Sequence, residues 1–366
     1  PAVAGGRVLV ASTDEHCVQA LDANSGKPLW RFTASARVDS PPTFYQGTAI
    51  FGCRDGYVYC LRASDGALAW RVRAAREERL IPANGQIESV SPVHGSVLIQ
   101  DNVAFATAGR SSYMDGGIDL CRIDPRTGKI LSRTPICSPD PQTGKQPPAS
   151  AGGIMPGARS DILSGDGAHV YLRDLVFSPQ GVAQPEGNDH LFSLTGFLDD
   201  AWAHRSYWIR GKQCSIATGC TKQDKGITYG RLLVFDNSTT YGYERATIHW
   251  SNQLLDGPYR LFARKPDAET PQWTKSLPIS ARALLLADKT LFVAGPPVGA
   301  IEKLGRDEKL RGGSLVAVSA QDGTELAKYP LDSSPVFDGM AAAGGRLFLS
   351  TIDGKVVSMG GDQMLP

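Results

Sequence analysis

A short segment of this sequence returns along the chain at a fixed spacing, and this repetition limits the possible folds more than any other feature. Leucine, glycine and tryptophan recur 40 residues apart in the segments 19–30 and 59–70, and the same unit returns at 121–129 and 315–323. Each copy reads as an alternating apolar strand, a polar turn that ends in glycine, and a second strand. Asp, Asn and Ser bond their own backbone in such turns, and glycine takes the position with positive φ. Since a missed repeat misassigns the whole fold, the repeat is interpreted first.

Each repeat unit is predicted to contain four antiparallel strands. In the second unit they cover residues 42–46, 49–53, 57–61 and 68–72. The 40 glycines and 24 prolines fit a chain with many turns between short strands. Four-stranded units of this length cannot bury their faces alone, so they pack around an axis as a β-propeller. We therefore predict an all-β propeller with seven four-stranded blades, or eight if the long fourth unit, 161–209, contains two.

The last predicted blade is incomplete within this chain. It has three strands, at 340–343, 346–351 and 355–359, and Pro1 begins directly on an inner strand. An unfinished sheet edge promotes aggregation. We therefore expect the missing strand to lie upstream of Pro1, and residues 1–366 to form a single propeller domain of a longer protein.

Charge and hydropathy argue against two classes of protein: nucleic-acid binders that act through bulk charge, and proteins with a transmembrane helix. The chain has 38 basic and 37 acidic side chains, a net charge of +1, which argues against nucleic-acid binding by bulk charge. No run of eighteen apolar residues occurs, so no transmembrane segment is predicted.

Seven cysteines without a Cys-x-x-Cys motif do not indicate a disulfide scaffold. Cys214 and Cys220 lie close together in one loop segment, and we expect them to form a disulfide in an oxidising compartment.

The repeated motif Ala-Leu-Asp-x-x-Ser-Gly-Lys-x-x-Trp resembles the pyrroloquinoline-quinone-like (PQQ-like) repeat. That repeat occurs in quinoprotein alcohol dehydrogenases and in the scaffold lipoprotein of the bacterial outer-membrane assembly machine. The resemblance implies that Trp30 and Trp70 pack each blade against the next; Ser132 and Ala327 occupy the equivalent places in later units. Four stretches look like uncharacterised planctomycete propellers of this class, which sit in longer exported proteins: 37–42, 54–56, 110–117 and 190–200. A periplasmic or extracellular location in a bacterium follows from the resemblance.

The resemblance does not extend to the quinone. Quinoprotein dehydrogenases of this fold have eight blades, a pair of adjacent cysteines under the quinone and a set of calcium-binding carboxylates. This chain is much shorter and has no two adjacent cysteines. We therefore predict no bound PQQ and no other cofactor, with calcium left open.

The long connections are expected on one face of the propeller. Connections between strands one and two, or three and four, lie on one face; those between strands two and three, or between blades, lie on the other. The first set is short, and the second set contains the segments 107–117, 178–189, 245–258, 294–313, 73–95, 137–160 and 211–229. Long loops often carry function. We call this side the long-loop face and predict that it binds a ligand or partner; the alternative is that it only tolerates insertions.

Arginines recur where the first strand of a blade begins: Arg37, Arg159, Arg231 and Arg282. With Asp39, Arg54, Arg110 and Asp161 they are the predicted ligand-binding residues. One interpretation is a ring of salt bridges between blades, with Asp39, Glu88, Asp161 and Asp338 as counter-charges. The other is a site for a carboxylate, a phosphate or an acidic sugar, since guanidinium groups bind such anions well.

Two further groups are candidates for chemistry. His94 with Glu88 is the candidate catalytic pair, because a carboxylate can orient and activate an imidazole; a structural histidine is the alternative. Asp199, Asp200 and His204 form a weak candidate metal set without zinc-type spacing, or else a charged loop. The sequence contains no Gly-x-Ser-x-Gly, phosphate-loop or His-Glu-x-x-His motif.

These observations favour a non-catalytic function. We predict an exported scaffold or recognition domain, which binds a protein partner or an acidic ligand, such as an acidic glycan or small anion, through the long-loop face. The alternative is an enzyme with its site at the channel mouth: a quinone-dependent dehydrogenase, or a lyase or hydrolase on anionic sugars. A propeller fold alone decides neither.

Overall fold

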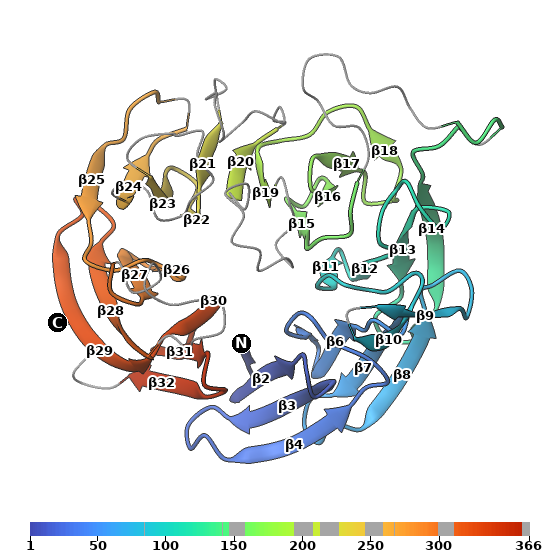
Figure 1. Cartoon of the computed structure of the whole chain (residues 1–366), viewed down its shortest axis with the longest axis horizontal. Coiled ribbons are helices and arrows are strands. Elements are labelled where there is room, and N and C mark those ends of the chain that lie inside the picture. The colour runs from blue at the N-terminus through green and yellow to red at the C-terminus, as the bar shows by residue number, and fades with distance from the viewer. Residues whose placement is uncertain are drawn as a thin grey trace.

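The computed structural model describes the chain except for residues 84, 141, 146–157, 194–207, 213–226, 246–258, 267, 299–310 and 361–366. The described secondary structure is entirely β, in sheets that stand radially around a central axis (Figure 1). Eight of these sheets form a propeller, each with its strands in chain order from the axis outward. The predicted all-β propeller is therefore confirmed, with the larger of the two blade numbers that the sequence allowed.

The first four blades are complete four-stranded antiparallel sheets. Blade 1 contains β1 (Ala2–Ala4), β2 (Arg7–Ser12), β3 (Cys17–Asp22) and β4 (Pro28–Thr33). Blade 2 contains β5 (Thr43–Tyr45), β6 (Thr48–Gly52), β7 (Tyr57–Arg62) and β8 (Leu68–Arg73). Blade 3 contains β11 (Leu98–Gln100), β12 (Val103–Ala108), β13 (Ile118–Ile123) and β14 (Ile130–Ile136). Blade 4 contains β15 (Leu163–Gly165), β16 (Val170–Leu172), β17 (Leu175–Phe177) and β18 (Ala183–Gln184).

The other four blades follow in the same direction around the ring. Blade 5 contains β19 (His190–Ser193), β20 (Trp208–Gly211) and β21 (Thr228–Gly230). Blade 6 contains β22 (Leu232–Phe235), β23 (Thr240–Arg245), β24 (Tyr259–Arg264) and β25 (Trp273–Ser276). Blade 7 contains β26 (Ala283–Ala287), β27 (Thr290–Gly295), β28 (Arg311–Ser319) and β29 (Glu325–Ser333). Blade 8 contains β30 (Pro335–Ala343), β31 (Arg346–Thr351) and β32 (Val356–Gly360), and its inner strand contacts both β26 and β1.

The extra blade was hidden in the predicted fourth unit, 161–209. The stretch 169–177 reads as one strand, but β16 and β17 are separate antiparallel partners joined at Arg173 and Asp174. Arg173 turns the chain there with φ of 56°, a left-handed conformation that is uncommon for a residue other than glycine. Because this turn lacks the usual Gly or Asn, it gives no signal in the sequence.

The same error affects the sorting of the loops. Residues 178–182 join β17 to β18, the third and fourth strands of blade 4, and so belong to the face with the short turns. The prediction that 178–189 is a long-loop-face segment is wrong for that part. The segment 211–229, predicted between blades, instead joins β20 to β21 within blade 5. The segment 73–95 connects blades 2 and 3, and 107–117 connects the second and third strands of blade 3, both on the long-loop face as predicted.

The core lies between neighbouring blades. Val58 and Cys60 of blade 2 pack against Ala104 and Cys121 of blade 3, and all four are buried. Similar apolar layers join blades 1 and 2, 3 and 4, 6 and 7, and 7 and 8. Fully burying an aliphatic side chain contributes roughly 1.5–3 kcal/mol. Burial of these side chains therefore stabilises the packing of each of these neighbouring pairs of blades.

Tryptophans connect the outer strands of successive blades. The indole Nε1 of Trp30 donates to Ala63 O of the next blade at 2.9 Å, and that of Trp70 donates to Pro125 O at 3.1 Å. Trp273 of blade 6 makes the same contact with Ala320 O at 3.1 Å, although its unit lacks the sequence motif. Each indole ring covers the turn glycine of the following blade: Gly66, Gly128 and Gly323 respectively. Trp30 and Trp70, assigned to blade docking from the sequence, thus lie at blade junctions, and Trp273 is a third example that the sequence did not indicate.

Gly66→Ala is expected to destabilise the protein more than Gly26→Ala. Both glycines have a left-handed backbone, with φ of 73° and 70°. A Cβ on Gly66 would meet the Trp30 ring at 2.7 Å, whereas a Cβ on Gly26 would have open space around it. The backbone penalty of about 1–2 kcal/mol is common to both, and overpacking adds about 1–3 kcal/mol for Gly66 alone. Urea unfolding of the two variants measures the difference; equal stabilities would contradict the packing role of Trp30.

Candidate functional site

A β-hairpin lies on the long-loop face between blades 2 and 3 and belongs to neither blade. It consists of β9 (Leu80–Ala83) and β10 (Gln86–Ser89), which pair only with each other among the described strands. The sequence analysis treated 73–95 as a loop. An Asn-Gly dipeptide, a common hairpin turn, directly follows the apolar run 80–83 and is the signal that could have identified it.

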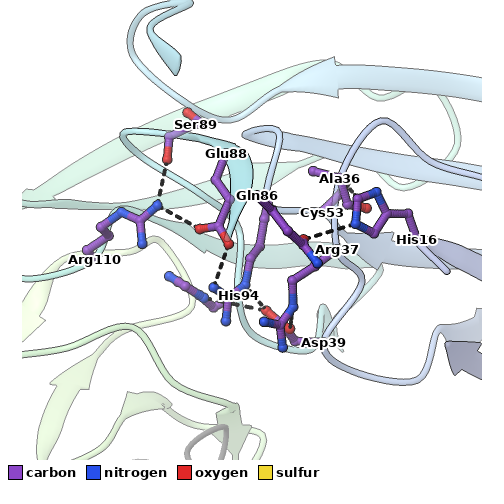
Figure 2. Close-up of polar contacts among 11 residues, drawn as sticks. His16, Ala36, Arg37, Asp39, Cys53, Gln86, Glu88, Ser89, His94 and Arg110 are labelled. Atoms are coloured by element: carbon purple, nitrogen blue, oxygen red, sulfur yellow. Dashed lines mark hydrogen bonds and ion pairs between the residues drawn. The ribbon is translucent and has the colours of Figure 1, made fainter. Parts of the chain in front are cut away.

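The inner side of the hairpin is fixed to the propeller by a buried carboxylate. Glu88 is fully buried and accepts hydrogen bonds from Arg54 Nη1 at 2.9 Å and from Arg110 Nη2 at 2.7 Å. Arg54 follows β6 in blade 2, and Arg110 follows β12 in blade 3. The same Arg110 nitrogen also donates to Ser89 O at 3.1 Å (Figure 2). Glu88 therefore ties the hairpin to two blades at once.

Two more contacts extend this attachment. The Ser89 backbone N–H donates to Arg54 O at 2.7 Å. His16 Nε2 lies 2.9 Å from Gln86 Oε1, so the hairpin also reaches the connection between β2 and β3 of blade 1 (Figure 2). Three blades thus hold the hairpin in place.

A second carboxylate, Asp39, lies beside Glu88 in the same cluster. Arg54 Nε donates to Asp39 Oδ2 at 2.5 Å, and Arg37 Nε lies 3.4 Å from Asp39 Oδ1. The His94 Nδ1 atom lies 3.5 Å from Asp39 Oδ2 (Figure 2). Burial alone would raise the pKa of Asp39, but hydrogen bonds from His94 and Arg54 lower it below its ordinary value. Asp39 is therefore ionised at neutral pH.

The imidazole of His94 is held in its neutral form. Burial lowers the pKa of His94 below its ordinary value, and the positive charges of Arg54 and Arg110 act in the same direction against Asp39. The structure places His94 against Asp39, whereas the predicted partner, Glu88, is occupied by two arginines. A neutral imidazole beside a carboxylate could move a proton. The enzymatic alternative stays a prediction.

We call these six residues the polar cluster: Arg37, Asp39, Arg54, Glu88, His94 and Arg110. All six side chains are at most one-quarter exposed. Three guanidinium groups face two carboxylates and a neutral imidazole, so three positive charges minus two negative charges leave a net charge of +1. Its residues come from the connection between blades 1 and 2, from blade 2, from the connection between blades 2 and 3, and from blade 3. Four of the predicted ligand-binding residues, and both candidate catalytic residues, are brought together here.

The other predicted ligand-binding residues are not members of the polar cluster, although Arg159 and Asp161 lie beside it. Arg159 is exposed and forms an isolated bridge with Ser111, and Asp161 is buried before β15, where it accepts a hydrogen bond from the Ile162 N–H at 2.7 Å. The Arg231 guanidinium lies 5.6 Å from the centre of the Phe337 ring.

Arg282 is buried in the connection before β26 and donates from Nε to Pro335 O at 3.0 Å. Its own carbonyl oxygen accepts from the Asp338 N–H at 2.8 Å. Arg282 therefore connects blades 7 and 8. Among the described residues the four arginines at blade starts do not form one group. The ion pairs of the polar cluster join the connection between blades 1 and 2 to blades 2 and 3.

Several candidates fall outside the described residues: Asp199, Asp200, His204, Cys214 and Cys220. Within the described part of the chain, no group of three or more His, Cys, Asp or Glu side chains is placed to hold a metal ion. The described cysteines form no disulfide; Cys17, Cys53, Cys60 and Cys121 are buried and Cys137 is exposed. No two of these described cysteines are adjacent in the chain, as the two cysteines under the quinone of a quinoprotein dehydrogenase are. In the described ranges no helix has the length and hydropathy to cross a membrane.

The outer side of the hairpin is apolar and exposed. Leu80 and Ile87 are 56% and 59% exposed, and Met114, in the connection between β12 and β13, is 55% exposed. Strand alternation places Leu80, Pro82 and Ile87 on the side opposite Glu88. Arg79 Nη2 donates to Asp115 Oδ1 at 3.0 Å, which joins the base of the hairpin to the Met114 loop. We call Leu80, Pro82, Ile87 and Met114 the hairpin patch.

Comparison with known proteins agrees with the repeat and the fold. Residues 1–149 match the family model described as outer membrane protein assembly factor BamB. The outer membrane protein assembly factor BamB of Xanthomonas campestris is 40% identical over 74 residues, which are 20% of this chain and 18% of that protein. The match therefore spans less than one-fifth of the relative's length.

Solved structures match over the whole ring at low identity. BamB from Moraxella catarrhalis has a TM-score of 0.53 at 13% identity, covering 100% of this chain and 94% of that one. Quinohemoprotein alcohol dehydrogenase from Comamonas testosteroni has a TM-score of 0.57 at 12% identity, covering 96% and 69%. The chain is a β-propeller of PQQ-like repeats that resembles the BamB class, as its sequence motif predicted.

Proposed function

We propose that this propeller is a non-catalytic scaffold outside the cytoplasm, which holds a protein partner against the hairpin patch of its long-loop face. The observation that carries the proposal is the hairpin patch itself. Leu80 and Ile87 are each more than half exposed on a hairpin that three blades hold in place, and Met114, also more than half exposed, lies on the neighbouring loop. Contiguous exposed apolar side chains mark interaction sites. A docking element that is already ordered loses little conformational entropy when it binds.

The resemblance to the BamB class supports the same function. The family match covers residues 1–149, which include the whole polar cluster and the hairpin patch. The relative is named an outer membrane protein assembly factor. We propose by analogy that this chain works in the periplasm as a binding component of such an assembly.

The double substitution Leu80→Ser with Ile87→Ser is expected to weaken capture of the partner at least tenfold. Each central apolar anchor of an interface contributes on the order of 1–2 kcal/mol, and 1.4 kcal/mol is a factor of ten in affinity. The purified chain serves as bait in a periplasmic extract of the native organism, and the captured protein is identified and its affinity measured.

The matched control is Leu68→Ser with Leu131→Ser. These leucines are 48% and 45% exposed but lie on the outer strands β8 and β14, away from the hairpin. The control is expected to bind like the unmodified chain. Equal capture by both double variants, each confirmed as folded, would remove the hairpin patch from the proposed function.

A further inference from the structure

We propose that the junction between blades 8 and 1 is a docking site for a β-strand that carries a tryptophan. The strand lies along β32 as the fourth strand of blade 8 and places its indole over Gly26 of blade 1. It belongs to the same polypeptide, outside residues 1–366, as expected from the incomplete blade. The site is separate from the hairpin patch, which lies between blades 2 and 3, so the inference goes beyond the scaffold function.

The first observation is one uncovered turn glycine. In three blades a tryptophan of the preceding blade covers the glycine between the third and fourth strands: Gly66, Gly128 and Gly323. In blade 4 this place is taken by Gly181, where a Cβ would meet the side chains of Arg122 and Thr134. Gly26 is the equivalent residue of blade 1, and a Cβ there would have no described atom within 4 Å. The place that a neighbouring blade covers elsewhere is therefore open at Gly26.

The acceptor for an indole N–H is also in position. Ala63 and Ala320 each donate their N–H to the first hairpin turn of their own blade, and their carbonyl oxygens accept from the tryptophan of the preceding blade. Ala23 has the same position in blade 1, since its N–H donates to Gly6 O at 2.9 Å. The carbonyl oxygen of Ala23 is thus placed to accept an indole N–H from the side of blade 8.

The side of blade 1 that faces blade 8 is apolar and only partly covered. In blade 2, Leu61 and Phe51 are buried beneath the outer strand β4 of blade 1. The residues at the same positions of blade 1, Leu21 and Val10, are each partly exposed. An outer strand on blade 8 would bury them as β4 buries their counterparts, which is favourable for apolar side chains.

The strand β32 presents the hydrogen-bonding edge that such a strand needs. It pairs with β31 and with no other described strand, next to blade 1 in the ring (Figure 1). The Thr351 N–H donates to Lys355 O at 2.9 Å, and alternation along an antiparallel pair then directs the backbone groups of Val356 and Ser358 away from β31. In three blades the residue at the position of Ser358 lies opposite the tryptophan: Ala20, Cys60 and Ala263. The docked tryptophan is therefore expected opposite Ser358.

The other blade junctions select the occupant. Tryptophan is the residue that this chain places over the turn glycine at three junctions, and at each of them both partners belong to one polypeptide. An uncovered strand edge pairs readily with other chains. A strand tethered to the same polypeptide has a high effective concentration at the edge and so protects it.

The first test is a titration of residues 1–366 with a peptide that has the sequence of residues 25–33, acetyl-Ser-Gly-Lys-Pro-Leu-Trp-Arg-Phe-Thr-amide. We expect saturable binding and slower deuterium exchange of the Val356 and Ser358 N–H groups. The same peptide with alanine in place of tryptophan should bind at least tenfold more weakly, because the anchor side chain is missing.

Substitution of the turn glycine tests the position of the indole. Gly26→Ala should weaken peptide binding at least tenfold, because a Cβ on the equivalent Gly66 would meet the Trp30 ring at 2.7 Å. Gly47→Ala is the matched control, since Gly47 also has a left-handed backbone, with φ of 80°, and open space around it, but lies in blade 2. This control should bind the peptide like the unmodified chain.

A photoreactive amino acid at position 358, introduced in the native organism, identifies the source of the strand. A cross-link within the same polypeptide, to a residue outside 1–366, supports the proposal. A cross-link to a different protein, or none, would overturn the assigned source. Equal binding of the two peptides, no saturable binding, or equal binding by the folded Gly26→Ala and Gly47→Ala variants would overturn the docking site. The Leu80→Ser, Ile87→Ser variant should still bind the peptide, which separates this test from that of the scaffold function.

Discussion

Replacing Trp70 by alanine is expected to lower the free energy of unfolding by about 3 kcal/mol, at the lower end of the range for buried tryptophan. The ring of Trp70 lies over Gly128 of blade 3, and its Nε1–H donates to Pro125 O at 3.1 Å. Alanine would remove this interblade contact and leave a void between the outer strands of blades 2 and 3. Urea unfolding followed by circular dichroism measures the change.

Two further substitutions at this junction separate the possible causes. Trp70→Phe keeps much of the ring but loses the hydrogen bond, so it should cost about 1 kcal/mol. Leu68→Ala changes an exposed residue of the same strand and should stay within about 0.5 kcal/mol of the unmodified chain. If Trp70→Ala is no less stable than Leu68→Ala, tryptophan does not join the blades.

Glu88→Gln is expected to lower the free energy of unfolding by about 3–5 kcal/mol, the range for removing one partner of a buried ion pair. Glu88 is fully buried and accepts from both Arg54 and Arg110. Arg54 keeps Asp39 as a partner after the substitution, but Arg110 loses the only carboxylate with which it forms an ion pair in the described structure. Unfolding in urea measures the global effect.

The same substitution should loosen the hairpin in particular. The N–H groups of Ser89 and Val90, which donate to Arg54 O and Arg79 O, should exchange with deuterium faster than in the unmodified chain. Glu78→Gln is the control, because Glu78 lies in the same connection but is exposed and pairs with Arg73 at 3.6 Å. Surface pairs of this kind contribute little. Similar stability and exchange in both variants would show that Glu88 does not anchor the hairpin.

The sequence predicted those parts of the fold that depend on residues adjacent in the chain. The turn chemistry around Gly26 and Gly66 and the alternating strands beside it predicted the blades, because short strands and tight turns are determined locally. The turn at Arg173 was missed because its left-handed residue is neither Gly nor Asn. The hairpin at 80–89 had a local signal, the Asn-Gly dipeptide, which was hidden by the assignment of the whole segment as a loop.

The polar cluster could be predicted only in part, because its contacts join residues far apart in the chain. Arg54 and Glu88 are 34 residues apart, and Arg110 and Glu88 are 22 apart. The repeat placed these residues on one face but could not determine which carboxylate each arginine meets. His94 was therefore assigned to Glu88, which the structure pairs with arginines, and not to Asp39. The contacts of Arg231 and Arg282 with blade 8 could not be predicted from the sequence for the same reason.

The proposed docking of a protein partner at the hairpin patch can be tested most directly by site-specific photo-cross-linking in the native organism. A photoreactive amino acid is placed at position 87, on the hairpin, or at position 68, on the outer strand β8; both native residues are large, apolar and about half exposed. We predict that position 87 yields one discrete cross-linked protein and position 68 yields none. Cross-linking to the same protein with equal yield at both positions, or at position 68 alone, would contradict the account.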